Sequence, residues 1–229
     1  MAKSIFVTAT GTDVGKTYVT ALLVKKLRGH GLNAGYYKAA LSGAAMVDGR
    51  LMPGDAKYVC DVAGLACDPA TLVSYLYQTP VAPHLAARLE GNPLELAVIR
   101  RDFTAMTRQY GYVVMEGAGG VICPLRDDET ACIHQIDVIR MLDLPIVIVT
   151  DAGLGAINAG LLTLEYAKKH RIDVTGFILN RYETGNFLHA DNQAQLERLG
   201  DVPVIARVAP NAVELDIDAA QLETFFRKV

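Results

Sequence analysis

Near its start the chain reads Ile5-Phe6-Val7-Thr8-Ala9-Thr10-Gly11-Thr12-Asp13-Val14-Gly15-Lys16-Thr17, and this stretch decides the fold. An apolar run, a glycine-containing turn and a helical pattern beginning at Lys16 are the layout of a phosphate-binding loop. In such a loop the backbone N–H groups and the helix N-terminus face an anion. Lys16 can then reach the β- and γ-phosphates, and Thr17 is placed to coordinate Mg²⁺. The sequence therefore predicts a polyphosphate site.

The loop departs from the common pattern at one position. Thr10 stands five residues before Gly15, where the pattern has a glycine, and Gly11 follows it. An ordinary Gly-rich turn between a strand and a helix is the alternative interpretation. The apolar strand before the loop and the amphipathic helix after it favour phosphate binding.

Length, composition and charge limit the class of protein. The chain has 229 residues, of which 51% are hydrophobic, so we expect residues 1–229 to form a single domain with a substantial core. The net charge of −3 and the scattered basic residues argue against nucleic-acid binding. No apolar run is long enough to span a membrane, and no signal-peptide core precedes the first strand, so we expect a cytoplasmic protein.

The cysteines and histidines show no metal-ligand spacing. Free thiols are expected for all four cysteines: Cys60, Cys67, Cys123 and Cys132. His30 and His170 fall at the ends of predicted helices, where a polar or cationic group suits the last carbonyls. His84 is the one histidine to weigh for function.

Strand and helix patterns alternate along the chain. Strands are predicted at Ser4–Thr8, Asn33–Lys38, Tyr112–Met115, Pro145–Thr150, Val174–Asn180 and Val204–Ala206. Helices are predicted at Lys16–Arg28, Ala56–Ala63, Ala82–Leu89, Leu94–Tyr110, Ile133–Leu142, Ala156–His170, Leu188–Leu199 and Ala219–Lys228. Because several strands are apolar without alternation, both of their faces are covered. The fold class is α/β: a doubly wound, mostly parallel sheet with helices on both faces, of the P-loop NTPase type. Residues 43–54 and 117–124 are expected to be long functional loops.

Four polar features follow predicted strands, where ligands bind in such sheets. Lys38 is either a solvated loop charge or a cation aimed at the phosphates. Glu116 is a candidate metal ligand, with a loop or capping acid as the alternative. Asp55 alone is better explained as a helix N-cap. The glycines of the turn Gly153–Asn158 expose helix N–H groups, which makes either a second anion site or a plain turn.

Taken together, these segments resemble the dethiobiotin synthetase family. The resemblance runs from about residue 3 to residue 180 and rests on six segments in the family's order: Thr10–Thr17, Gly35–Gly43, Gly54–Ala56, Pro80–His84 with Glu90-Gly91, Met115–Gly120 and Gly153–Asn158. It implies a P-loop ligase that uses ATP and Mg²⁺. The implied reaction converts 7,8-diaminononanoate and CO₂ or bicarbonate into dethiobiotin, ADP and phosphate, through a carbamate and a carbamic-phosphoric anhydride.

The resemblance also implies roles for individual residues. The nucleotide would contact Asp13, Val14, Gly15, Lys16, Thr17, Tyr18, Glu116, Gly119 and Asn180. The Mg²⁺ ligands would be Thr17, Asp55 and Glu116, and the catalytic residues would be Lys16, Lys38, Thr12 and Ser42. The diamine would contact Thr12, Lys38 and Ser42, and its distant carboxylate would contact Gly155, Ala156, Ile157 and Asn158 of a partner subunit. The resemblance thus implies a homodimer with a shared active site.

The residues themselves are compatible with this chemistry. A carbamate and a triphosphate repel each other, so cations and N–H donors must converge where they meet. No nucleophilic Ser/His/Asp or Cys/His set is found, and phosphoryl transfer between bound substrates requires none. Two alternatives remain: a P-loop switch ATPase of the partitioning or metallochaperone type, and the synthetase domain of a cobyrinate-type amidotransferase. Nucleotide preference stays open, because Asn180 is followed by Arg181 without a nearby aspartate.

Overall fold

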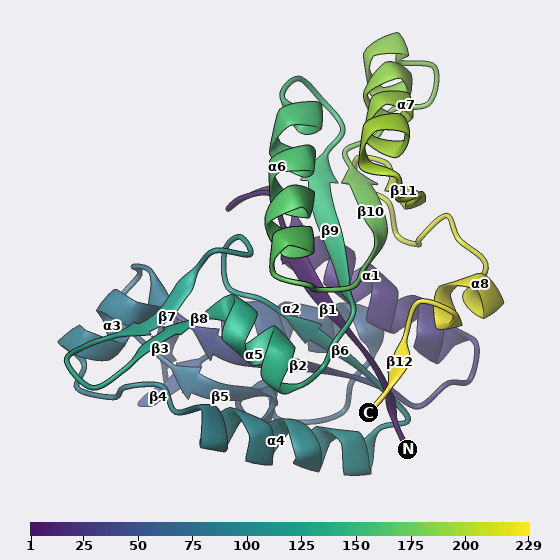
Figure 1. The fold of residues 1–229 in the computed structure, drawn as a ribbon. Helices are drawn as coiled ribbons and strands as arrows, with labels where there is room; N and C mark the ends of the chain where they lie inside the picture. Colours follow the sequence, from purple (N-terminus) through teal and green to yellow (C-terminus); the bar gives the residue numbers. More distant parts are fainter.

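Seven parallel strands form the centre of the computed structural model, which describes residues 1–229 (Figure 1). Their spatial order is β11 (Val204–Val208), β10 (Val174–Asn180), β9 (Ile146–Asp151), β1 (Lys3–Ala9), β6 (Tyr112–Glu116), β2 (Ala34–Leu41) and β5 (Val73–Leu76). The short strand β12 (Arg227–Lys228) pairs antiparallel with β1. The predicted parallel α/β fold is confirmed.

Helices cover both faces of this sheet. They are α1 (Lys16–Gly29), α2 (Gly54–Ala63), α3 (Pro83–Leu89), α4 (Leu96–Gln109), α5 (Gln135–Met141), α6 (Ala156–Lys169), α7 (Phe187–Gly200) and α8 (Ala219–Glu223), with a 3₁₀ turn η1 at Pro69–Leu72. In Figure 1, α4, α5 and α6 lie in front of the sheet, and α1 and α2 lie behind it. None of these helices has the length and apolar character needed to cross a membrane.

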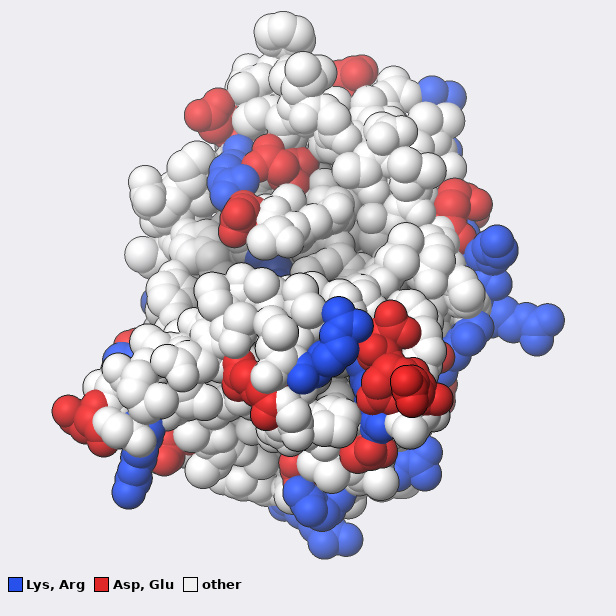
Figure 2. Space-filling view, turned by 90° about the vertical axis from the view of Figure 1, so that its left-hand side faces the viewer, with Lys and Arg blue, Asp and Glu red and all other residues white.

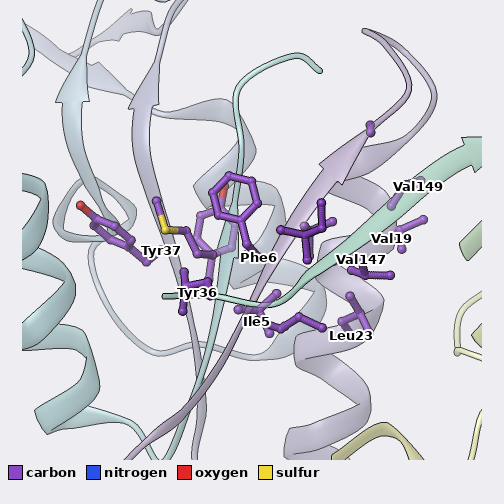
Figure 3. Close-up of a cluster of buried hydrophobic side chains, with 14 of the residues drawn as sticks. Ile5, Phe6, Val19, Leu23, Tyr36, Tyr37, Val147 and Val149 are labelled. Atoms are coloured by element: carbon purple, nitrogen blue, oxygen red, sulfur yellow. The ribbon is translucent and has the colours of Figure 1, made fainter. Parts of the chain in front are cut away.

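The core forms where the central strands meet α1. Figure 3 shows Ile5 and Phe6 of β1 beside Val147 of β9, with Leu23 of α1 close by and Tyr36 of β2 on the other side. All five side chains are buried. Strands that carry apolar residues at both odd and even positions can be buried only between two helix layers, because successive side chains point to opposite faces.

Two hairpins were missed by the sequence patterns. Strands β3 (Ala45–Val47) and β4 (Arg50–Met52) occupy the segment predicted to be loop 43–54. Their turn, Asp48-Gly49, has φ of 48° and 75°, and an Asp-Gly pair with two positive φ angles is a common hairpin turn that could have predicted them. The second hairpin joins β7 (Pro124–Asp127) and β8 (Cys132–His134).

Two further predictions were wrong in part, and one strand of the sheet was missed. The helix expected at Ile133–Leu142 begins at Gln135, because the preceding residues pair in β8. The helix expected at Ala219–Lys228 ends at Glu223, since Phe226 is buried edge-on against Tyr112 and Arg227 pairs with β1. Strand β5 was not predicted, because its four residues alternate between buried and half-buried positions in too short a run. The four cysteines are free, and His30 and His170 cap the ends of α1 and α6, as expected.

The strand order determines where a ligand can bind. Strands β6, β2 and β5 lie on one side of β1, and β9, β10 and β11, which follow later in the chain, lie on its other side. The strand order therefore reverses its direction beside β1. Ligands bind at such a point, outside the carboxyl ends of the strands. The register also places Glu116 of β6 between Val7 of β1 and Lys38 of β2. The residues predicted from separate motifs therefore meet at one edge of the sheet.

Candidate active site at the phosphate loop

The loop between β1 and α1 has the backbone geometry of an anion cradle. Asp13 and Gly15 adopt left-handed conformations, with φ of 61° and 87°. A Cβ on Gly15 would lie 2.1 Å from Asn180 Nδ2, so only glycine fits at that position. The N–H groups of residues 11–15 donate no hydrogen bond within the chain. Helix α1 begins directly after them, at Lys16. These unpaired donors and the helix N-terminus together form a site for phosphate groups.

A buried carboxylate lies beside this cradle. Glu116, at the end of β6, has no solvent-exposed surface. Its Oε1 accepts hydrogen bonds from Thr17 Oγ1 at 2.8 Å, Lys38 Nζ at 2.8 Å and Lys16 Nζ at 3.2 Å. Lys38 Nζ also contacts Asp55 Oδ2 at 2.5 Å. Five of the residues singled out in the sequence therefore form one charged cluster: Lys16, Thr17, Lys38, Asp55 and Glu116.

The cluster shifts the pKa values of its members. Burial opposes ionisation of Glu116, but the charges of Lys38 and Lys16 outweigh it and lower the pKa of this carboxyl to about 2. Burial also disfavours the charged form of Lys38, and the carboxylates of Glu116 and Asp55 overcome this effect and raise its pKa. Both groups are therefore ionised at neutral pH.

Tyr36 fixes the orientation of the carboxylate. Its hydroxyl donates to Glu116 Oε2 at 2.9 Å, and its ring is completely buried in β2. No sequence motif pointed to this tyrosine. Its position two residues before Lys38 on the same strand, and hence on the same face of the sheet, was the available signal.

Lys16, Thr17, Lys38 and Asp55 of the cluster line a cleft of about 600 Å³, and the buried Glu116 lies behind its wall. Its lining includes these predicted residues: Thr12, Asp13, Gly15, Lys16, Thr17, Tyr18, Lys38, Ser42, Asp55 and Gly119. Figure 2 shows the face on the left of Figure 1, with a hollow across its middle and a basic side chain inside. Acidic and basic side chains are mixed over the rest of this face. A larger groove of about 940 Å³ lies between α4 and α5 and contains none of the predicted site residues.

Oxygen atoms suited to bind Mg²⁺ lie close together at the cleft. Thr17 and Glu116 lie within hydrogen-bond distance of each other, and Asp55 reaches the same lysine as Glu116. Hydroxyl and carboxylate oxygens are the ligands that Mg²⁺ prefers. Asp55 is the second residue of α2 and makes no capping hydrogen bond, so the N-cap interpretation was wrong.

Some predicted residues lie outside the cleft wall. Asn180 and Val14 are behind the loop, where Asn180 Nδ2 donates to the Val14 carbonyl at 2.9 Å. The turn residues form a separate group that does not line the cleft of the same chain: Gly155, Ala156, Ile157 and Asn158. Gly155 has φ of 93° and precedes α6, so this turn presents a second helix N-terminus. His84, at the start of α3, does not line the cleft either.

Comparison with known proteins places this site in a family. A family model described as an AAA domain matches residues 3–215. The ATP-dependent dethiobiotin synthetase BioD of Clostridium botulinum (strain Alaska E43 / Type E3) is 44% identical over 226 residues, which cover 99% of each chain. The chain belongs to the dethiobiotin synthetase family. The BioD of Brachyspira hyodysenteriae, 43% identical over 99% of this chain and 100% of its own, supports the same assignment.

More distant structures share the fold alone. A ParA family ATPase from Chlorobium tepidum TLS has a TM-score of 0.57 at 14% identity, covering 92% of this chain and 86% of that one. The receptor FtsY from Elizabethkingia anophelis, solved with GDP, has a TM-score of 0.55 at 14% identity, covering 100% of this chain and 65% of that one. The P-loop NTPase fold predicted from the sequence is thus confirmed. Dethiobiotin synthetases have it in common with proteins of other functions.

The charge on Glu116 makes stability depend on pH. Its pKa is about 2 in the folded protein against an ordinary value of 4.5, so ionisation contributes up to about 3 kcal/mol of stability. This contribution is present above pH 4.5 and is lost progressively as the pH falls toward 2. We expect the free energy of unfolding, measured by urea titration without nucleotide or Mg²⁺, to fall over that range.

Two variants isolate the effect of this carboxylate. Glu116→Gln removes the titrating group, so its unfolding free energy should change less between pH 5 and pH 3 than that of the unaltered protein. Glu129→Gln alters an exposed glutamate in the β7–β8 turn and should preserve the pH dependence. An equally steep pH dependence in Glu116→Gln would show that another group is responsible.

Proposed function

We propose that this protein carboxylates 7,8-diaminononanoate with CO₂ and closes the ring to dethiobiotin, converting ATP to ADP and phosphate. One observation carries the proposal: Lys16 and Lys38 meet at the carboxylate of Glu116 beside an unpaired phosphate cradle. This arrangement occurs in a chain 44% identical to a BioD over its whole length. A site that must hold a triphosphate next to a carbamate needs this convergence of cations.

The residues of the cleft would divide the work. Lys16 and the loop N–H groups would hold the β- and γ-phosphates. Thr17, Asp55 and Glu116 would be the ligands of Mg²⁺, which neutralises phosphate charge and orients the transferred group. Lys38, together with Thr12 and Ser42, would hold the carbamate. Lys38 would also offset the charge that develops as the carbamate oxygen approaches the γ-phosphorus.

The nucleotide contacts extend to both sides of the loop. Asp13, Val14, Gly15, Tyr18 and Gly119 surround the phosphate path in this proposal. Asn180 would contact adenine, and its burial behind the loop puts its amide next to Gly15. Val14 and Tyr18 pack against one core of 63 buried side chains, and this single core supports a single domain over residues 1–229.

We also propose that the active enzyme is a cytoplasmic homodimer. The turn Gly155–Asn158 lies outside its own subunit's cleft and would bind the diamine's carboxylate in the partner's site. Leu154, directly before this turn, is 94% exposed, and Leu162 on the following helix α6 is 64% exposed. Exposed apolar side chains that lie together mark surfaces covered in an assembly, so these two leucines support the proposed dimer contact.

The relatives disfavour the alternative functions. A switch ATPase shares the fold, as the ParA-like structure shows, but its resemblance is limited to 14% identity. Relatives at 42 to 44% identity are dethiobiotin synthetases, and one of them is matched over 100% of both chains.

The reaction can be tested with purified protein, ATP, Mg²⁺, bicarbonate and 7,8-diaminononanoate. We expect phosphate release and dethiobiotin formation only when the diamine is present. Lys16→Ala should lower the rate by about 10² to 10³, because it removes a cation from the transferring phosphate. Lys57→Ala, which alters an exposed lysine on α2, is the matched control and should keep full activity. Phosphate release that ignores the diamine would contradict the proposal.

A mixing experiment tests the shared active site. Lys16→Ala disables the phosphate loop, and Asn158→Asp puts a negative charge at the third residue of α6, where it repels the substrate carboxylate and favours the helix N-terminus. Each variant alone should be inactive. Coexpression should restore about a quarter of the unaltered activity, because half of the dimers then hold one intact site of two. Absence of complementation, with heterodimers demonstrated, would contradict the shared site.

A further inference from the structure

An arginine with no assigned role connects the phosphate loop to the rest of the sheet edge. Arg181 directly follows β10 and has a left-handed backbone with φ of 57°. Its Nη2 donates to the Asp13 carbonyl at 2.7 Å, and its Nη1 contacts Asp151 Oδ2 at 2.5 Å. Asp151 is the last residue of β9 and the register partner of Asn180. One guanidinium therefore joins the loop to two neighbouring strand ends.

This contact controls the direction of a phosphate-binding N–H group. In a planar trans peptide the carbonyl of one residue and the N–H of the next point in opposite directions. Arg181 holds the Asp13 carbonyl, and Asn180 holds the Val14 carbonyl at 2.9 Å. The N–H groups of Val14 and Gly15 are consequently turned away from β10. Both are without a hydrogen-bond partner in the chain.

Asp151 connects the same contact to the second turn. Its Oδ2 pairs with Arg181, and its Oδ1 accepts the Gly153 N–H at 2.8 Å. A single carboxylate thus fixes both the arginine and the turn that precedes α6. The side chains of Asp151 and Arg181 therefore connect the phosphate loop to this turn.

We propose that Arg181 is a positioning residue for the nucleotide triphosphate, with Asp151 as its anchor. The inference rests on the proposed function only in requiring a bound triphosphate. The pair is half exposed, and an ordinary surface ion pair of this exposure contributes little to stability. The pair acts instead on the loop, because Arg181 holds the Asp13 carbonyl in the orientation that leaves the Val14 N–H free for the phosphates.

Nucleotide binding by three variants tests the role of Arg181. Titration calorimetry with a non-hydrolysable ATP analogue and Mg²⁺ should give a Kd about tenfold weaker for Arg181→Ala, the scale expected for losing a charged hydrogen bond. Arg181→Lys retains one donor cation and should recover part of this loss. Arg171→Ala is the matched control, because Arg171 also has a positive φ, 58°, but its side chain makes no hydrogen bond. Its Kd should be unchanged.

Kinetics separate positioning from a purely structural effect. In the dethiobiotin assay, Arg181→Ala should raise the KM for ATP while kcat at saturating ATP stays within about twofold. A Kd for the analogue within twofold of the unaltered protein would overturn the proposal, as would an equal loss in Arg171→Ala. If the unaltered protein binds the analogue but makes no dethiobiotin, the proposed function fails and the binding comparison still decides the role of Arg181.

Discussion

A fully buried carboxylate, Glu116, lies between two lysines and determines which elements must meet at the phosphate loop. Moving an isolated carboxylate out of water costs several kcal/mol, and Glu116 has no exposed surface. It is stable there because Lys16, Lys38, Thr17 and Tyr36 all donate to its oxygens. These donors come from α1 and β2, so the carboxylate requires β6 to lie between β1 and β2. The strand order is therefore the one that brings these donors to the carboxylate.

This cluster is preorganised for a larger anion. Lys16 is its most weakly held member, at 3.2 Å from Glu116 and partly exposed to the cleft. A nucleotide that brings its own negative charge and a divalent cation offers Lys16 a phosphate partner and Glu116 a metal partner. When Lys16 and Glu116 separate in this way, each gains a new partner of opposite charge, so no buried charge is left unpaired. Lys38 keeps Asp55 as a second partner throughout.

The sequence predicted most of the sheet and the centre of the site, for identifiable reasons. Long apolar strands such as β1 and β9 and the Gly-Lys-Thr turn carry strong local signals, and Lys38 and Glu116 stand at strand ends, where ligands bind. The contacts of Arg181 could not be predicted, because they depend on a left-handed backbone that adjacent residues do not encode. Tyr36 was missed although it alternates with Lys38 on one strand, because its partner Glu116 is 80 residues away. The role of Asp55 was misjudged for the same reason: its partner, Lys38, is 17 residues away. Short, half-exposed strands such as β5 and β8 gave too little periodicity to recognise.

Lys16, Lys38 and Glu116 together should receive a magnesium nucleotide at the phosphate loop. A crystal structure with a non-hydrolysable ATP analogue, Mg²⁺ and 7,8-diaminononanoate would show whether they do. We expect the phosphates on the N–H groups of residues 11–15, Lys16 moved from Glu116 to a phosphate oxygen, and the metal on the Thr17 side of the Glu116 carboxylate. A nucleotide bound elsewhere, with the contact between Lys16 and Glu116 intact, would contradict it.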